Sequence, residues 1–465
     1  MFRRPSPRSR CPRSAAASAG ATTPPSCTPS ARSRPSPRPT ARSPRTSRSC
    51  GACSKADAPS RTFDAPRRRG KLRGPIIEAA EPTAAHNRTG STPMRISVER
   101  SALLKATSRA QGVVERRTTI PILSNVLIEA EGGAARLRAT DLDLEIVESV
   151  PAMVEQAGAV TVPAHTLHEI VRKLPDGAQL TLAEEPGAGR LTVTAGRSRF
   201  TLPTLPREDF PAMTSGEYDV SYATVAAVLR RLFDKSSFAI STEETRYYLN
   251  GVYLHVVEVD GAPRLRAVAT DGHRLACIDA EAPEGAAGAP DVIVPRKTVG
   301  ELRKLLENDD AEVRVSVSPT KIRFEASDLA LTSKVIDGSF PDYTRVIPHQ
   351  NDKRMETDAE EFAKAVDRVA TVSADRARAV KLSLEEDRLT LTVTSPDAGS
   401  ATEEITVSYA EDPLEIGFNA KYLLEIAGQI DRENAVFLFA DSGAPTLVRE
   451  GEDASAVYVV MPMRV

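Results

Sequence analysis

The sequence predicts an α+β protein in which three similar domains, each with two helices and about eight antiparallel strands, follow one another along the chain. The length of 465 residues suits about three domains of ordinary size. A strand-to-helix motif recurs three times, and most other segments alternate apolar with polar residues, as strands of a sheet covered on one face do. We place the domains at residues 94–214, 215–346 and 347–465.

Residues 1–93 differ in composition from the rest of the chain. They contain 15 Pro, 14 Ser and 17 Arg and carry a formal net charge of +15, whereas the remaining residues carry −17. A segment with so few apolar residues cannot offset the entropy lost on folding, so we expect a disordered basic leader. Its composition is that of an organellar transit peptide or a nucleic-acid-binding arm. We favour the hypothesis that the native protein begins at Met94 and that the leader is translated upstream sequence, and a genuine disordered arm is the alternative.

The composition also excludes two broad classes of protein. No run of 18 apolar residues occurs, so we expect no membrane-spanning helix and no membrane partner. Four of the five cysteines lie in the first 53 residues, and only Cys277 lies beyond them. This usage does not support a disulfide scaffold and indicates a reducing compartment, so we expect a cytoplasmic protein.

The motif shared by the three copies is a strand that leads into a helix. It reads VTVPAHTLHE from Val160, VIVPRKTVGE from Val292 and IGFNAKYLLE from Ile416. The first two copies place a proline at the helix start, which its fixed φ suits. The third copy has Asn419 there, and asparagine caps helices well.

Each copy begins with another helix, which alternating strands follow. The strand sequences are SNVLIEA and LRATDLDLEIV in the first copy, LNGVYLHVVEV and LRAVATDGHRLACI in the second, and VKLSLEE and LTLTVTS in the third. A Phe-Pro step, at Phe210 and Pro211 and again at Phe340 and Pro341, leads into the connectors between copies.

The early helix of each copy has an apolar face and basic residues away from it. At 100° per residue, Lys105 and Arg109 lie opposite the apolar stripe of the first helix. Lys364 and Arg368 have equivalent positions in the third copy, and Arg231 lies off the stripe in the second. The stripes are Leu103, Ala106, Ala110, Val113 and Val114; Val225, Val228, Leu229 and Leu232; and Phe362, Ala365, Val366 and Val369. Ordinary solvated faces would explain any single helix, but basic residues on equivalent helices of an acidic body favour a polyanion ligand.

The motifs give no support for catalysis. Asp271 and His273 lie two residues apart, a spacing that is poor for sharing a proton, and no nucleophile motif accompanies them. His165 and His168 lack the further ligands that a metal site needs. The chain has neither a GxGxxG nor a Walker loop, so we expect no cofactor and no enzyme activity. The competing hypothesis is a nucleic-acid-processing enzyme with a basic arm, which would need a carboxylate or histidine cluster.

Long segments of residues 94–465 resemble the bacterial sliding clamps, the beta subunits of DNA polymerase III. The matching segments are RRTTIPILSN, GRSRFTLPTLPREDFP, TRYYLNGVYL, VATDGHRLA, VIVPRK, TSKVIDGSFPDY and YVVMPMRV. The resemblance implies a clamp fold in which two chains join head to tail into a ring around double-stranded DNA, without reading its sequence. It further implies a non-catalytic subunit whose partners are the polymerase III alpha subunit, the clamp-loader complex, and other polymerases and repair proteins that attach through short peptides.

The resemblance also implies three sets of site residues. The partner-binding groove between the second and third domains comprises Leu249, Thr270, Gly272, His273, Arg274, Leu275, Pro341, Arg345, Val346, Val459, Val460, Met461, Pro462, Met463 and Arg464. The DNA-binding set, with the basic helix residues included, is Lys105, Arg109, Arg117, Arg231, Tyr247, Tyr248, Arg296, Lys297, Lys364 and Arg368. The dimer joint involves Phe200, Thr371 and Val372. Two positions depart from the compared members: Glu243 stands where one has Gln, and Val465 stands where others have Leu.

Overall fold

The computed structural model describes residues 93–464 apart from 186, 214–215, 307, 374–378 and 432–433. The expectations for the basic leader up to residue 92 and for Val465 lie outside these residues. The described part contains no helix long and apolar enough to cross a membrane.

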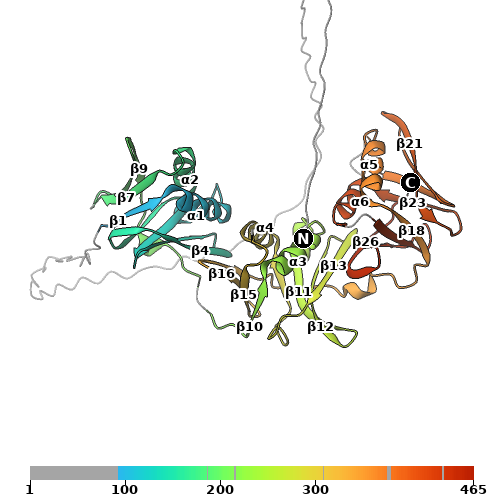
Figure 1. The fold of residues 1–465 in the computed structure, drawn as a ribbon, viewed down its shortest axis with the longest axis horizontal. Helices are drawn as coiled ribbons and strands as arrows, with labels where there is room; N and C mark the ends of the chain where they lie inside the picture. The colour runs from blue at the N-terminus through green and yellow to red at the C-terminus, as the bar shows by residue number, and fades with distance from the viewer. Residues whose placement is uncertain are drawn as a thin grey trace, which may run out of the picture. The chain divides into compact units, whose positions relative to one another are not determined.

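The first copy of the repeat contains two α-helices in its described part (Figure 1). Its elements are β1 (Arg95–Glu99), α1 (Arg100–Val113), η1 (Pro121–Ser124), β2 (Asn125–Glu131), β3 (Ala134–Thr140), β4 (Leu144–Pro151), β5 (Met153–Gln156), β6 (Gly158–Pro163), α2 (Ala164–Lys173), β7 (Gln179–Glu185), β8 (Arg190–Ala195), β9 (Ser198–Pro203) and η2 (Arg207–Asp209).

The second and third copies repeat this order. The second consists of β10 (Val220–Val225), α3 (Ala226–Ser237), η3 (Glu244–Leu249), β11 (Gly251–Val259), β12 (Ala262–Thr270), β13 (Arg274–Glu281), β14 (Val292–Pro295), α4 (Arg296–Leu305), β15 (Glu312–Val317), β16 (Lys321–Ala326), β17 (Leu329–Lys334) and, in the connector that follows, η4 (Tyr343–Arg345). The third consists of β18 (Lys353–Asp358), α5 (Ala359–Ala370), β19 (Ala379–Glu385), β20 (Arg388–Ser395), β21 (Gly399–Thr406), β22 (Ser408–Tyr409), β23 (Leu414–Asn419), α6 (Ala420–Ala427), β24 (Asn434–Phe439), β25 (Thr446–Glu450) and β26 (Asp453–Val460). The predicted fold class is confirmed.

Two of the four antiparallel sheets formed by the described strands run from one copy of the repeat into the next. β17 of the second copy pairs with β4 of the first, which gives the order β10-β15-β16-β17-β4-β3-β2-β6. β26 of the third copy pairs with β13 of the second, which gives β14-β11-β12-β13-β26-β25-β24-β18-β22, and these two strands lie side by side in Figure 1. The remaining sheets, β5-β1-β7-β8-β9 and β21-β20-β19-β23, each belong to one copy. The last strand of a copy therefore joins the sheet of the copy before it.

The recurring strand-to-helix motif starts the second helix of each copy. Pro163 and Pro295 precede α2 and α4 with φ of −57° and −59°, values that the proline ring favours. Asn419 precedes α6, and its side-chain oxygen accepts a hydrogen bond from the backbone N–H of Lys421 at 2.9 Å. The exchange of proline for asparagine thus preserves the helix start by a different physical means.

The apolar stripes of α1 and α5 are buried as predicted, whereas the prediction for the second copy is wrong at Val225. That residue is the last of β10 and the N-cap of α3, and it is 44% exposed. The helical period begins one residue later, so Ala226, Leu229 and Leu232 are buried together with Phe233. A strand that runs directly into a helix hides this change of period in the sequence.

Candidate functional site

An apolar surface lies over the joint between β13 and β26. Leu275 and Val459 face each other across this joint and are each 1% exposed. They form one cluster with Cys277 and Val346, and Val346 is only half-buried. Burial raises the pKa of the Cys277 thiol to about 12, so this thiol is a protonated packing group. The surface thus combines strand residues with the connector that follows β17.

The C-terminal segment is bonded to both sides of this joint. The backbone N–H of Met461 donates to the carbonyl of His273 at 2.8 Å, and that of Met463 donates to the carbonyl of Gly417 at 2.9 Å. Met461, Pro462 and Met463 are half-buried and Arg464 is exposed, whereas Val460 is buried on β26. The main-chain bonds therefore hold the two predicted methionines beside the joint.

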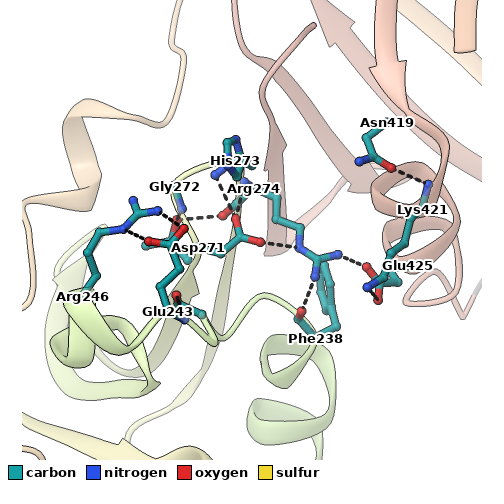
Figure 2. A network of polar contacts seen from close by, with 12 residues as sticks. Phe238, Glu243, Arg246, Asp271, Gly272, His273, Arg274, Asn419, Lys421 and Glu425 are labelled. Carbon is teal, nitrogen blue, oxygen red and sulfur yellow. Dashed lines mark hydrogen bonds and ion pairs between the residues drawn. The ribbon is translucent and has the colours of Figure 1, made fainter. Parts of the chain in front are cut away.

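The turn before β13 is organised by its own side chains (Figure 2). Asp271 Oδ1 accepts hydrogen bonds from the backbone N–H groups of His273 at 2.8 Å and of Arg274 at 3.0 Å, and Thr270 Oγ1 donates to the Arg274 carbonyl. Gly272 has φ of +88°, and a Cβ there would lie 2.7 Å from a terminal nitrogen of Arg246. Asp271 therefore has a structural role, and the left-handed backbone at Gly272 favours glycine, whereas the flexible end of Arg246 could move aside.

Arg274 points away from the apolar surface and into the contact between the second and third copies. Its side chain is 6% exposed and donates to Asp271 Oδ2, to the carbonyl of Phe238 at 2.7 Å and to Glu425 of α6 (Figure 2). Its guanidinium carbon also lies 5.1 Å from the centre of the Phe238 ring and 4.6 Å from that of Tyr422. Sequence reasoning assigned Arg274 to partner binding and gave no role to Tyr422 or Glu425, although both lie in the third copy of the recurring motif, IGFNAKYLLE.

The remaining predicted partner-binding residues divide by exposure. His273, Pro341 and Arg345 are exposed, and Arg345 pairs with Asp342 at 2.8 Å. Leu249, at the end of η3, is 4% exposed. The exposed residues are accessible to a ligand, whereas Leu249 acts through packing.

The equivalent joint between the first and second copies has the opposite character. Glu145 of β4 pairs with Thr332 of β17 at the register that Leu275 and Val459 have in the other joint. Glu145 Oε2 accepts a hydrogen bond from the backbone N–H of Met213 in the connector at 3.2 Å. A polar cavity of about 440 Å³ lies here, and its lining includes Arg136, Arg138, Glu145, Arg323 and Glu325. At the register of Leu275 and Val459, the joint between the second and third copies is therefore apolar, whereas the joint between the first and second copies is polar.

The predicted DNA-binding residues fall into two groups. Lys105, Arg117 and Arg296 are exposed and form no ion pair within the part of the chain that the structure describes. Tyr247 is 54% exposed, and its ring centre lies 5.8 Å from that of the half-buried Tyr248. These five residues are available to a polyanion.

The second group has partners within the protein. Arg109 pairs with Glu148 at 2.7 Å, Lys364 with Glu360 at 2.5 Å, Arg368 with Glu403, and Lys297 with Asp141 at 2.5 Å. Arg231 donates to the carbonyl of Asp279 at 2.7 Å and to Ser455 Oγ at 2.6 Å. Arg231 therefore ties α3 to the third copy, which gives it a structural role that its place on the helix wheel did not predict.

The charge of the Glu243 carboxylate is balanced by a neighbouring cation. Both of its carboxylate oxygens accept hydrogen bonds from Arg246, at 2.7 and 2.8 Å (Figure 2). These bonds hold the pKa of the Glu243 carboxyl below its usual range, so it is ionised at neutral pH. Any repulsion of phosphates by this carboxylate is reduced by the adjacent guanidinium.

The three predicted dimer residues lie on or beside unpaired sheet edges. Phe200 is half-buried on β9, and β9 is the last strand of its sheet. Thr371 is exposed at the end of α5, and Val372 is half-buried next to it. β21, which packs against α5, is the edge of the sheet in the third copy.

Three repeated α+β units, sheets that continue from unit to unit, the edge strands β9 and β21 and a set of basic helices define a DNA clamp subunit. Residues 94–214, 224–342 and 344–464 match the N-terminal, central and C-terminal domains of the DNA polymerase III beta subunit. The chain belongs to the family of the DNA polymerase III beta subunits, or beta sliding clamps. It is therefore a non-catalytic processivity subunit, and the resemblance stated from the sequence is confirmed.

Characterised relatives and solved structures agree with this membership. The beta sliding clamp of Caulobacter vibrioides is 56% identical over 372 residues, and that of Escherichia coli is 38% identical over 373 residues; each alignment covers 80% of this chain and 100% of the relative. A sliding clamp from Bartonella birtlesii bound to griselimycin is 51% identical, with a TM-score of 0.78, over 80% of this chain and 100% of that one. A Pseudomonas aeruginosa clamp bound to griselimycin has 41% identity and a TM-score of 0.76 over the same shares.

Proposed function

We propose that two copies of this chain form a closed ring around double-stranded DNA and tether the replicative polymerase to it. The observation that carries the proposal is the repeated sheet joint, because one further joint of the same kind closes the chain on a second copy. A ring held by topology needs no base contacts, so it can slide. We further propose a cytoplasmic location, which a role in replication supports.

The joint between the two chains of the ring is proposed to form between β9 of one chain and β21 of its partner. Phe200, Leu331 and Tyr458 hold the same register in the last strands of the three repeats, opposite Val193, Phe324 and Val448 respectively. Leu331 and Tyr458 are each paired with the preceding repeat and are at most 1% exposed. Phe200 has no such neighbour in the described chain and is half-buried, which supports a partner at β9. The head-to-tail contact then satisfies both open edges.

The DNA-facing residues are proposed to be the exposed cations and tyrosines of the helices and of η3. The set is Lys105, Arg117, Tyr247, Tyr248, Arg296, Lys297, Lys364 and Arg368, and Arg109 joins it if DNA competes with Glu148. Arg231 is left out because its guanidinium is bonded inside the protein. Surface ion pairs such as that of Lys364 are weak, so a phosphate can replace the carboxylate.

The apolar surface over the joint of β13 and β26 is proposed as the groove for partner peptides. Its floor is Leu275 and Val459, and its walls are Val346 of the connector and Met461 and Met463 of the C-terminal segment. Flexible methionine side chains suit a groove that takes several sequences. The proposed occupants are segments of the polymerase III alpha subunit, of the clamp loader, and of other polymerases and repair proteins. We propose that griselimycin, which is bound to two related clamps, occupies the same groove.

The ring is tested by retention on DNA of different topology. The protein is loaded by its own clamp loader onto nicked circular DNA, the complex is isolated, and half of it is cut with a restriction enzyme. We expect the clamp to stay on circles in high salt and to leave linear DNA by sliding off the ends. Equal retention on circles and linear DNA would mean binding by ordinary contacts, and the ring would be rejected.

The groove is tested by Met463→Ala, with Met153→Ala as the control. Met153 is 70% exposed on β5, on the first copy and far along the chain from the groove. We expect Met463→Ala to weaken griselimycin and alpha-subunit peptides while the ring remains on DNA, since a few anchor side chains carry most of such binding energy. Unchanged affinity would place the peptides elsewhere.

A further inference from the structure

We infer that Tyr343, held by His255 and Arg266, is a positioning residue that sets the connector wall of the peptide groove. The inference rests on the proposed function, because it assigns residues that shape that groove without touching the peptide. Neither the helix pattern nor the motifs in the sequence single out Tyr343, His255 or Arg266.

Tyr343 is a buried anchor in an otherwise exposed connector. It begins η4 and is 6% exposed, whereas Pro341, Asp342 and Thr344 are exposed. Its ring belongs to the same apolar cluster as Leu275, Val459 and Val346. The ring thus fixes the connector to the groove floor.

The hydroxyl of Tyr343 sits in a chain of polar groups on the face of the sheet. Arg266 donates to the hydroxyl oxygen at 3.2 Å, and the hydroxyl lies 3.2 Å from Nε2 of His255, to which it can donate. Arg266 is itself held by both oxygens of Asp279, at 2.6 and 2.7 Å. His255, Arg266 and Asp279 are direct neighbours across β11, β12 and β13. Three strands therefore define where the hydroxyl must lie.

This chain of contacts controls the connector wall through one short turn. The backbone N–H of Val346 donates to the carbonyl of Tyr343 at 3.0 Å, which closes η4. The position of Val346 therefore depends on the position of Tyr343, and Arg345 lies within the same turn. If the hydroxyl loses its hydrogen-bond partners, only the packing of the Tyr343 ring holds the turn, and the connector wall can adopt several positions. Peptide binding must then order this wall, and the entropy lost in doing so weakens the affinity.

The protonation state of His255 is part of the arrangement. Burial lowers the pKa of His255, so the ring is neutral at pH 7 and its Nε2 can accept the Tyr343 proton. The groups that face it are Tyr253 on its own strand, Arg266, Asp279, Asp291 and Tyr343. A protonated His255 can no longer accept this hydrogen bond and places a second cation beside Arg266.

The experiment compares Tyr343→Phe with Tyr253→Phe in the full-length dimer, with griselimycin as the probe. Both changes remove one hydroxyl and keep the ring; the Tyr253 hydroxyl donates to Asp291 at 2.8 Å and has no bond to the connector. We expect about five- to tenfold weaker griselimycin binding for Tyr343→Phe, the size of one lost buried hydrogen bond, and no change for Tyr253→Phe. Retention on circular DNA should be unchanged in both.

A pH series with His255→Gln separates positioning from general stability. Glutamine keeps an acceptor but does not titrate, so griselimycin affinity should fall between pH 7.5 and 5 more steeply for the unaltered protein than for His255→Gln. All other residues are the same in the two proteins, so the difference between their pH profiles isolates His255. Parallel pH profiles, or equal losses for the two tyrosine variants, would overturn the inference. Failure of the unaltered protein to bind griselimycin would instead overturn the proposed groove.

Discussion

Arg274 and Lys235 place two buried positive charges between the second and third copies. Lys235 is 7% exposed and reaches Asp431 at 2.6 Å and Glu450 at 3.3 Å, and Arg274 reaches Glu425. In both cases a cation of the second copy is paired with carboxylates of the third. Buried charges are tolerated only when they are paired, so these contacts fix the position of one copy against the other.

Replacing Arg274 with Met should destabilise the protein by about 3 kcal/mol, because it leaves the Glu425 and Asp271 carboxylates without their shared partner. The free energy of unfolding is measured with urea. Arg345→Met is the matched control, since the Arg345 side chain is 84% exposed and its pair with Asp342 is local. We expect no measurable change for the control. An equal loss in both variants would contradict a special role for Arg274.

The pH dependence of stability should contain a contribution from His168. This residue is 6% exposed, its Nδ1 lies 3.4 Å from Thr107 Oγ1, and burial lowers its pKa. Above the pKa of about 6.5 in the unfolded protein, the His168 ring is neutral in both the folded and the unfolded state, and no stability is lost. As the pH falls below that value the unfolded state binds the proton first, so stability declines until the lower folded pKa is reached.

The measurement is thermal unfolding of the full chain at several pH values between 7.5 and 5. The His168→Leu variant should lose less stability over this range than the unaltered protein, because it has no proton to bind in the unfolded state. Identical slopes would show that His168 is not protonated differently in the two states.

At the scale of elements, the same strand-to-strand joint is used at each boundary between copies. A strand edge carries unpaired N–H and C=O groups, and the joints β17 to β4 and β26 to β13 satisfy them within the chain. Among the edge strands of the described part, β9 is the last strand of the first copy, as β17 and β26 are of theirs, and β21 is the edge that packs against α5. Stability and assembly therefore depend on the same kind of main-chain pairing.

Phe200→Arg on β9 should convert the dimer to monomers, because it places an unpaired charge in the proposed joint. Light scattering gives the mass in solution. Met153→Arg is the control, since β5 is the opposite edge of the same sheet and Met153 is exposed. We expect this control to remain dimeric. Dimers in both variants would mean that the joint lies elsewhere.

The sequence predicted the elements well wherever periodicity determines burial. The stripe of Phe362, Ala365 and Val366 required no knowledge of the rest of the chain, and all three are buried. The roles of Arg231 and Arg274 could not be found in this way. Their partners Ser455 and Glu425 lie 224 and 151 residues away, and only the fold brings them together. The partner-binding set and the DNA-binding residues Arg117, Tyr247 and Tyr248 came from resemblance, whereas the basic helix residues came from the helix pattern. Both sets remain predictions.

At the scale of the whole molecule, charge is unevenly distributed. Residues 94–465 carry a net charge of −17, yet Lys105, Arg117 and Arg296 are exposed cations on helices or next to them. We expect an acidic body with basic helices to direct DNA to those helices and to repel it from other surfaces. The affinity for DNA should therefore depend strongly on salt.

The Arg117→Ala, Arg296→Ala double variant should bind DNA more weakly and with a shallower salt dependence. Each lost phosphate contact lowers the slope of log affinity against log salt by about 0.9. Fluorescence anisotropy with a labelled duplex at several salt concentrations gives the slope. Arg136→Ala is the control, because Arg136 is exposed on the sheet face of β3 beside the polar cavity. A slope unchanged in the double variant would exclude these residues from DNA contact.

If the proposed groove is correct, the polar pair of Glu145 and Thr332 limits how many proteins can bind one ring at once. Of the four joints within the two chains of a dimer, two would then be apolar and two polar, so the ring would offer two docking places rather than four. Two different proteins could then bind one ring at the same time, but a third could bind only after one of them dissociates. Which protein occupies a docking place would then depend on the concentrations of the competing proteins and on how slowly each one dissociates. The order of events at a replication fork would therefore follow from competition for two binding sites.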